Sequence, residues 1–518
     1  MEPISVAKLR QSTNCFEWRD LILAPPIQPL TKQFEALDQY LASPNLPPEV
    51  REIMRQRPGL TGSEFWLMID VKFGGSNYSR KRRPAWFDSL PRSVLRSLAY
   101  SYRIDGGRRE VATICAVPFS SLHYTIFEGG LIDAAVQAFR LGRLLMIGQL
   151  GFLQGPVGRS CHQVVYGEIF KHNRFEHVMN VAAIATLLAR NLGLTRSQTD
   201  HLVLAAATHD ALTPAGGDTT KALDFEAFDE DLHYPEILVG EEWEELRRRF
   251  RIDRGLLTQT VLGRGLLGGL LDISDKIGYS GSDFVNFLRR HMEAGGMLPE
   301  HAEIERLLSK HPTICDVWDT VRVVGDRVVY ADPDRLGRFL KARALMFKSV
   351  YYGAETRCYD FVLGSVVMRY LYSHGKLTRE WLLEATDRQL LALIQQALEL
   401  DDLFLYGPML GLEQITETYA SLVEALEAER KWLGQGKQVC VIESIASFKI
   451  KPGLNLPVLT KPGGPIREFQ EVRPRLTAEL KEIARIQKPY RVYCLPDLVP
   501  SDVLIRVLKF HQRTRTLK

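Results

Sequence analysis

The sequence lacks the cysteine patterns of a cross-linked or zinc-binding protein. Its seven cysteines include no C-x-x-C pair, and their number is odd. Scattered cysteines in odd number are typical of reduced thiols, so we expect neither a disulfide framework nor a zinc finger. The N-terminal stretch MEPISVAKLRQSTNCFEWRD has no apolar signal-peptide core, and no uncharged apolar run reaches the length of a membrane span. These absences predict a cytoplasmic protein with no membrane partner.

A strong excess of one charge is also missing. Lys and Arg number 66 against 62 Asp and Glu, so the net charge is +4 and does not demand a nucleic-acid partner. Two local stretches are basic: Arg80–Arg83, with Trp86 and Phe87 close behind, and Arg247–Arg254. Either could bind the phosphates of a nucleic acid while aromatic rings stack on its bases. A solvated surface is the alternative interpretation, which we favour for both stretches.

The apolar pattern divides the chain into three parts. Residues 1–115 are mixed and contain the strand-like runs FWLMIDVKFGG and EVATICAVPF. Residues 116–400 carry an almost wholly helical pattern. Residues 401–518 begin helically and continue with the strand-like runs QVCVIESIASF and PYRVYCLP around a Pro/Gly-rich stretch. We predict a mainly α protein, with a helical core between a small mixed α/β N-terminal part and a C-terminal α/β appendage.

A histidine interrupts the buried face of one predicted helix in the central part. Within residues 174–193, His177 shares a face with Val181 and Ile184, one and two turns further on. Gly193 follows the last apolar residue of this pattern and supplies a C-cap. The imidazole of His177 is therefore expected to point into the interior.

Two further predicted helices carry polar residues on their inward faces. One opens at Thr195, where Gln198 completes a capping box, and its apolar face ends in His209, next to Asp210. The other, GLLGGLLDISDKIGY, places Asp275 one turn after a buried leucine. Three helices would thus direct four polar side chains at one interior: His177, His209, Asp210 and Asp275.

Two imidazoles and two carboxylates form a ligand set for a divalent metal ion, and the residue types leave Mg, Mn, Fe and Zn open. Such a set leaves coordination positions for a water molecule and a phosphate oxygen. The pattern therefore predicts phosphate-ester hydrolysis. For any one histidine alone, a satisfied core residue is the better interpretation, but the four residues with their spacing favour a metal site.

Further motifs surround these residues. HNRFEH at 172–177 is similar to an H-x-R-F-E-H motif, and DKIGYSGSD at 275–283 keeps a D-K-x-x-Y-x-x-x-D spacing. Upstream, Asp133, Arg143-Leu144 and Gln149-Leu150-Gly151 match a "D…RL…QLG" lead-in. Together they resemble the HD-domain metallohydrolases, and within them the deoxynucleoside triphosphate triphosphohydrolases, including bacterial dGTPases and the SAM-and-HD-domain dNTPase. The resemblance covers roughly residues 115–400 and implies an HD-domain helical core.

The resemblance assigns roles to individual residues. It implies that the metal ligands are His177, His209, Asp210 and Asp275, and that the phosphate contacts are Arg174 and Lys276. It implies that the rest of a deoxynucleotide (dNTP) substrate contacts Gln149, Leu150, Tyr279, Asp283 and Tyr359. The implied reaction cleaves the bond between the 5′ oxygen and the α-phosphorus, releasing deoxynucleoside and triphosphate. Relatives form homo-oligomers, often with nucleotide bound between subunits, so a homo-oligomer and a nucleotide activator are expected here.

The chain departs from the family at two histidine positions. Relatives read roughly H-D-x-G-H-x-P-F-x-H, whereas this chain has Thr213 and Asp218 at the second and third histidines. The first of these missing histidines is the family's proton donor or relay, and a threonine hydroxyl is too weak an acid to replace it. We therefore take His233 or Asp218 as the candidate catalytic proton donor. Two alternatives stay open: an HD phosphodiesterase or nuclease acting on single-stranded nucleic acid, and a nucleotide-binding scaffold that has lost catalysis.

Overall fold

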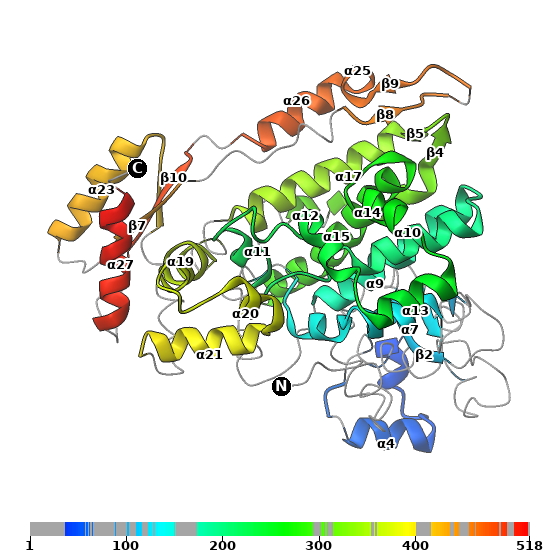
Figure 1. The fold of residues 1–518 in the computed structure, drawn as a ribbon, viewed down its shortest axis with the longest axis horizontal. Coiled ribbons are helices and arrows are strands. Elements are labelled where there is room, and N and C mark those ends of the chain that lie inside the picture. The colour runs from blue at the N-terminus through cyan, green and yellow to red at the C-terminus, as the bar shows by residue number, and fades with distance from the viewer. Residues whose placement is uncertain are drawn as a thin grey trace.

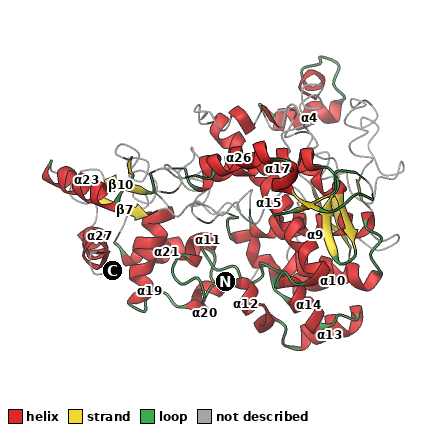
Figure 2. Cartoon of the chain, turned by 90° about the horizontal axis from the view of Figure 1, so that it is seen from above, coloured by secondary structure: helices red, strands yellow, loops and turns green. Residues whose placement is uncertain are grey.

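The computed structural model describes, with short internal gaps, residues 37–65, 101–149, 173–293, 302–399, 416–494 and 502–515, together with Ser89 and Gly151. Helices dominate these ranges, and the strands form three small sheets (Figure 1, Figure 2). The predicted mainly α fold with small α/β parts is confirmed. Within the described ranges, no helix combines the length and apolar content that crossing a bilayer requires.

Three helices form the centre of the fold: α9 (Arg174–Asn191), α10 (Arg196–Thr208) and α15 (Gly265–Glu293). The side chain of Asn173 caps α9 by accepting from the Glu176 backbone N–H at 2.9 Å. Thr195 and Gln198 form the predicted capping box at the start of α10. These caps fix where the helices begin, and therefore which residues face the interior.

Close packing between α9 and α15 depends on one glycine. A Cβ atom on Gly278 would lie 3.0 Å from Cγ2 of Val181, which is tighter than ordinary van der Waals contact. Val181 and Ile184 on α9 are fully buried, as their period predicts. The missing side chain at position 278 lets the two helices approach closely beside His177 and Asp275.

Further helices surround these three, and most of them contribute side chains to one continuous apolar core. They are α7 (Leu131–Ala138), α11 (Gly217–Lys221), α12 (Glu230–His233), α13 (Glu241–Phe250), α14 (Arg254–Val261), α17 (Pro333–Met346), α19 (Arg369–Ser373), α20 (Arg379–Glu384) and α21 (Asp387–Ala397), with the shorter turns η2 (Leu141–Met146), η4 (Tyr234–Ile237) and η5 (Ile314–Thr320) and the π-helical segments η6 (Phe347–Tyr351) and η7 (Phe361–Met368). Outside this core, α4 (Pro48–Gln56) lies near the N-terminal sheet in Figure 1.

The N-terminal sheet is small and has the strand order β1-β3-β2. Its strands are β1 (Ser101–Tyr102), β2 (Glu110–Cys115) and β3 (His123–Phe127). The strand predicted in EVATICAVPF is therefore confirmed as β2. Most of the other strand-like run, FWLMIDVKFGG, lies outside the described residues.

The chain after residue 415 contributes to two different sheets. The strands β8 (Pro457–Val458) and β9 (Arg467–Glu468) extend a hairpin of the helical part, β4 (Val321–Val324) and β5 (Arg327–Tyr330), and the neighbouring helices are α25 (Phe469–Val472) and α26 (Pro474–Ile483). The other sheet has the order β6-β10-β7, with β6 (Thr416–Tyr419), β7 (Cys440–Ser444), β10 (Tyr490–Cys494) and the helices α23 (Leu422–Gly434) and α27 (Asp502–Arg515). The second sheet contains both strands predicted in the C-terminal part.

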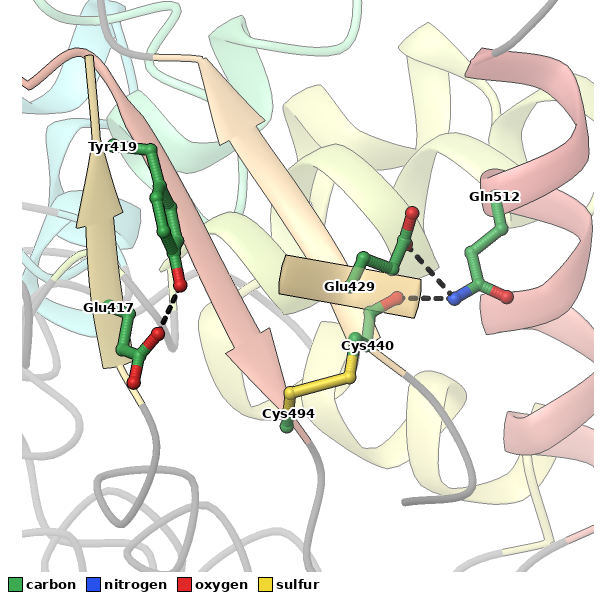
Figure 3. Close-up of a disulfide and its surroundings, with 6 residues drawn as sticks. All are labelled: Glu417, Tyr419, Glu429, Cys440, Cys494 and Gln512. Atoms are coloured by element: carbon green, nitrogen blue, oxygen red, sulfur yellow. Dashed lines mark hydrogen bonds between the residues drawn. A yellow bond between two sulfur atoms is a disulfide. The ribbon is translucent and has the colours of Figure 1, made fainter. Parts of the chain in front are cut away.

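A disulfide joins the central strand of that sheet to one edge strand, through Cys494 on β10 and Cys440 on β7 (Figure 3). The two residues are directly opposite in antiparallel register, with their Cα atoms 4.2 Å apart. Both face the small apolar cluster beneath α23, and Gln512 of α27 donates to the Cys440 carbonyl at 2.5 Å. The expectation of free thiols is wrong for this pair, because strand pairing brings together cysteines 54 positions apart that show no motif in the sequence.

The opposite face of the sheet is tied to the helical core by buried charges. Glu443 on β7 accepts from Arg357 Nη2 at 2.6 Å and from the Tyr493 hydroxyl at 2.6 Å. Arg357 also pairs with Asp360 at 3.1 Å, and Asp360 accepts from the hydroxyl of Thr219 on α11. A chain of polar contacts therefore runs from the C-terminal sheet to α11.

Candidate metal centre

Two imidazoles and a carboxylate from three helices meet at the centre of the fold. Oδ1 of Asp275 on α15 lies 3.1 Å from Nε2 of His177 on α9 and 3.6 Å from Nε2 of His209 at the end of α10. One ligand atom from each residue lies within 4.8 Å of the other two, which is a spacing that a single metal ion can bridge. Residues 98 positions apart in sequence thus offer a compact donor set, as their helical periods predict.

The histidine rings are oriented for ligation. Nδ1 of His209 lies 2.9 Å from the Ala206 carbonyl, so this nitrogen carries the proton and Nε2 can bind a cation. Burial disfavours a charged ring, but the negative charges of Asp210 and Asp275 outweigh it and raise the pKa of His209 to about 9. The same histidines hold the pKa of the Asp275 carboxyl well below its usual range, although burial opposes this. The cluster is therefore a site with strong preference for positive charge, and the residues fit a divalent ion.

Asp210 borders this group and is held by Arg174 from the first turn of α9. Arg174 Nη1 donates to Asp210 Oδ2 at 2.7 Å, and that oxygen lies 3.5 Å from Nε2 of His177. Nη2 of Arg174 lies 2.8 Å from Oδ1 of Asp218. The Arg174 side chain is 6% exposed and that of Asp218 is 44% exposed. A phosphate would therefore reach this guanidinium by displacing the more exposed partner, Asp218.

Thr213 and Asp218, which stand where the motif that the sequence resembles has histidines, are both connected to the ion pair between Lys221 and Glu230. Lys221 Nζ lies 2.6 Å from Oε2 of Glu230 and 3.3 Å from Oδ1 of Asp218. The other oxygen of Glu230 accepts from the Thr213 hydroxyl at 2.9 Å. Burial disfavours the charged form of Asp218, but Arg174 and Lys221 outweigh it and lower its pKa. Asp218 is therefore an ionised hydrogen-bond acceptor, not a proton donor.

The structure gives His233 contacts that engage both of its ring nitrogens. Nδ1 lies 2.6 Å from Oε1 of Glu236, and Nε2 lies 3.0 Å from the Glu226 carbonyl. Neither contact involves the metal cluster. Asp231 lies two residues before His233, and its side chain is exposed. Desolvation of its carboxyl raises its pKa to about 6, although the charge of His209 opposes this shift.

Two polar residues that follow Asp275 on the same face of α15 form hydrogen bonds with residues of α17 and η6. Tyr279 and Asp283 lie one and two turns after Asp275 and therefore share its face. The Tyr279 hydroxyl accepts from Arg343 Nε at 2.5 Å, and Asp283 accepts from the Tyr351 hydroxyl. Sequence reasoning missed Arg343 and Tyr351, since their relation to α15 is visible only once α17 and η6 are packed on it.

Lys276 lies on another face of α15 and lines a small cavity formed mainly by residues of α15 and α17. Its Nζ is bonded to Asp272 Oδ2, one turn earlier, at 2.5 Å. The cavity is mostly apolar, and its two basic lining residues are Lys276 and Arg343. The guanidinium of Arg343 lies over the Tyr279 ring, 5.5 Å from its centroid. Lys276 and Arg343 therefore make this wall the positively charged side of the cavity.

Gln149 lies beside the start of α9, although 25 residues separate it from Arg174. An antiparallel bridge between Gly148 and Asn173, and a 2.9 Å bond from the Arg174 backbone N–H to the Ile147 carbonyl, bring the two segments together. Gln149 is buried, and within the described residues its Oε1 has no hydrogen-bond partner. This buried acceptor is available to a bound ligand. Two other predicted substrate contacts, Leu150 and Tyr359, lie outside the described residues.

Asp387 at the start of α21 holds two site loops together and was not singled out from the sequence. Its Oδ2 accepts from the Gly148 N–H at 2.9 Å, and its Oδ1 accepts from the Gly216 N–H at 2.7 Å. Gly148 precedes Gln149, and Gly216 precedes the helix that carries Asp218. One buried carboxylate thus fixes both loops relative to each other.

The basic stretch Arg247–Arg254 has the contacts of a solvated helix end. Arg247 pairs with Glu244 at 2.9 Å, and Arg248 Nε donates to the Glu244 carbonyl at 3.1 Å. Acidic residues open α13 and basic ones close it, which is the arrangement that the helix dipole favours. Nothing in these contacts favours a nucleic-acid surface. The other stretch, Arg80–Arg83, lies outside the described residues.

Solved structures share the fold, although the sequence matches no protein-family model and no curated sequence. A phosphohydrolase from Bacteroides thetaiotaomicron aligns over 73% of this chain and 98% of its own, with a TM-score of 0.51 and 16% identity. A hypothetical protein from Aquifex aeolicus aligns over 80% of this chain and 100% of its own, with a TM-score of 0.49 and 18% identity. At this identity, the likeness to the phosphohydrolase establishes the fold.

Proposed function

We propose that this chain is a phosphohydrolase that holds a divalent metal ion with His177, His209 and Asp275, and with Asp210 as a fourth ligand. The observation that carries the proposal is the convergence of three donor atoms from three buried helices within 4.8 Å of one another. Buried histidines and carboxylates concentrated at one point are costly unless a partner compensates them. The phosphohydrolase with the same fold supports the same class of chemistry.

When bound, the ion would lower the pKa of a water molecule and polarise a phosphate. Arg174 would supply a fixed positive charge beside the ligands, since its guanidinium is buried and already aligned by Asp210. Arg343 would add a second cation, because it bonds the Tyr279 hydroxyl on the face of α15 that carries Asp275. Two cations beside one metal site suit a substrate with more than one phosphate.

For the substrate we propose a deoxynucleoside triphosphate, cleaved between the 5′ oxygen and the α-phosphorus into deoxynucleoside and triphosphate. The motif resemblance implies this substrate, and three described residues support it. Gln149 offers a buried oxygen that lacks a partner, while Tyr279 and Asp283 continue the face of α15 beyond Asp275. These polar groups would bind a sugar hydroxyl and define one wall against its ring.

The test is a screen of the four dNTPs, singly and mixed, with Mn²⁺ or Mg²⁺, and with products identified by mass. We expect release of triphosphate and deoxynucleoside from at least one condition. His209→Ala should abolish the release. The matched control is His374→Ala, which removes an exposed histidine directly after α19. Its ring contacts Tyr370 and Phe510, and within the described residues these contacts do not include the candidate metal ligands.

Failure to release triphosphate in any condition would contradict the substrate assignment. Equal activity of wild type and His209→Ala would contradict the metal site itself. Tight binding of a dNTP without turnover would select a nucleotide-binding scaffold instead.

A further inference from the structure

Lys221 is a partly buried cation beside the candidate site, and the reaction proposed above does not yet use it. Its side chain is 21% exposed and lies between two carboxylates, Asp218 and Glu230. Asp218 shares Arg174 with the candidate metal ligand Asp210. Lys221 is therefore two ion pairs away from the metal ligands, on the side of the site where relatives have histidines.

The hydrogen bonds around Lys221 leave one donor for a ligand. An ammonium group carries three N–H donors, and in the described part of the chain Nζ has two partners, Glu230 at 2.6 Å and Asp218 at 3.3 Å. Both oxygens of Glu230 are occupied, one by Lys221 and one by the Thr213 hydroxyl. The acidic partners thus fix the lysine, and its third N–H can serve a bound molecule.

Three neighbouring groups are unsuited to donate a proton. Asp218 is ionised, since Arg174 and Lys221 lower its pKa. Both ring nitrogens of His233 have partners outside the cluster. The Thr213 hydroxyl is buried and committed to Glu230. Lys221 is different: its ammonium group carries a proton at neutral pH, and two of its three N–H donors are taken by Glu230 and Asp218.

We propose that Lys221 is the catalytic residue that protonates the leaving 5′ oxygen. The assignment rests on the proposed function, because it needs an alkoxide leaving group at this site. The bond from water oxygen to the α-phosphorus forms as the bond to the 5′ oxygen breaks, and the electron pair stays on the 5′ oxygen. A proton from Nζ neutralises that oxygen. The attacking water gives its proton to solvent, and solvent returns one to the lysine.

The experiment compares substrates with poor and good leaving groups. Lys221→Met should lower kcat for the dNTP by about 10²- to 10³-fold, the usual contribution of a general acid, with KM within about threefold. It should change hydrolysis of bis(4-nitrophenyl) phosphate by less than about threefold, because 4-nitrophenolate leaves without a proton. The matched control, Lys376→Met, removes an exposed lysine and should leave both rates unchanged.

Lys221→Arg separates proton donation from charge pairing. Arginine keeps the positive charge between Glu230 and Asp218 but holds its proton far more tightly. We expect it to restore the thermal stability lost in Lys221→Met while kcat for the dNTP stays at least about tenfold low. Full recovery of kcat in Lys221→Arg would overturn the assignment, since a purely structural role needs only the charge.

Other outcomes are equally decisive. No triphosphate release by wild type overturns the proposed function, and the assignment with it. Wild-type release together with an unimpaired Lys221→Met overturns the assignment alone. If Asp231→Asn lowers kcat for the dNTP but not for bis(4-nitrophenyl) phosphate, and Lys221→Met does not show this difference, the proton donor is Asp231.

Discussion

The two sides of the candidate site are built in different ways. His177, His209 and Asp275 come from helices of 18, 13 and 29 residues, in the interior of the fold or at a helix end. The other side comes from helices of 5 and 4 residues, α11 and α12, and the turn before them. Long helices position their side chains through periodic burial, whereas short ones depend on the contacts that their own side chains make. The apolar core therefore positions the side of the site with His177, His209 and Asp275. A network of ion pairs positions the other side, which we call the α11–α12 side.

The largest expected effect is the loss of activity when a residue of the metal-ligand side is replaced. Asp275→Asn removes a candidate metal ligand, and loss of the metal's contribution of several kcal/mol corresponds to a fall of about 10³-fold or more in kcat/KM. Metal content measured by mass spectrometry should fall in parallel. Retention of both metal and activity would show that the cluster is not the metal site.

The next largest effect concerns Arg174, which joins the two sides. Arg174→Ala leaves the carboxylates of Asp210 and Asp218 without their cation, and breaking a buried pair in this way costs about 3–5 kcal/mol of unfolding free energy. Urea denaturation measures the change. Arg196→Ala is the matched control, since its side chain is 90% exposed and the expected change is under about 0.5 kcal/mol. Equal effects of the two substitutions would mean that Arg174 does not bridge the sides.

Only the metal side should respond to pH between 7 and 9. His209 binds a metal as the neutral ring, and the neighbouring carboxylates raise its pKa to about 9 although burial opposes them. Below that pH the ion must displace a proton, so Mn²⁺ affinity should rise about tenfold per pH unit and level off above pH 9. Calorimetry in buffers of different ionisation enthalpy should detect the released proton. Affinity that is constant from pH 7 to 9 would contradict this account.

The smallest expected effects are the losses of stability when either of two glycines is replaced by alanine. A Cβ on Gly364 of η7 would run into the Thr219 side chain on α11, whereas a Cβ on Gly278 would press on Val181 beside the metal cluster. Gly364→Ala should cost about 2–3 kcal/mol of unfolding free energy and lower kcat, because it shifts α11. Gly278→Ala should cost about 1 kcal/mol, because the better helix propensity of alanine offsets part of the crowding. Thermal melts of both variants test this order, and the reverse order would overturn it.

The sequence predicts the part of the site that lies on long helices and does not predict the part that ion pairs hold. The faces of α9, α10 and α15 repeat every three to four residues, so periodicity alone brought His177, His209 and Asp275 to one interior. The pairing of Lys221 with Glu230 has no such signal, because it depends on how a loop of eight residues folds back between α11 and α12. Asp387 and Arg343 lie far along the chain from the groups that they hold, and only the packed fold relates them to the site.

The fold shows the same limit. The central helices and three strands, β2, β7 and β10, could be predicted from caps and apolar patterns. The Cys440–Cys494 disulfide could not, because it depends on the register of two strands whose pairing the sequence does not encode locally. The pairing of β8 with β5 was likewise hidden, since it joins strands of two residues and four residues across more than a hundred positions.

The ion pair between Glu443 and Arg357 constrains how this chain could be shortened. Glu443 is 1% exposed and supplies the carboxylate for an arginine that also holds Asp360 under α11. A fragment that stops after α21 would keep Arg357 and Asp360 but lose Glu443, the main counter-charge of Arg357. Its newly exposed apolar surface would include the face that Val441 and Tyr493 now cover. We therefore expect the C-terminal sheet to stabilise the helical core, and a fragment without it to be less stable than the full chain.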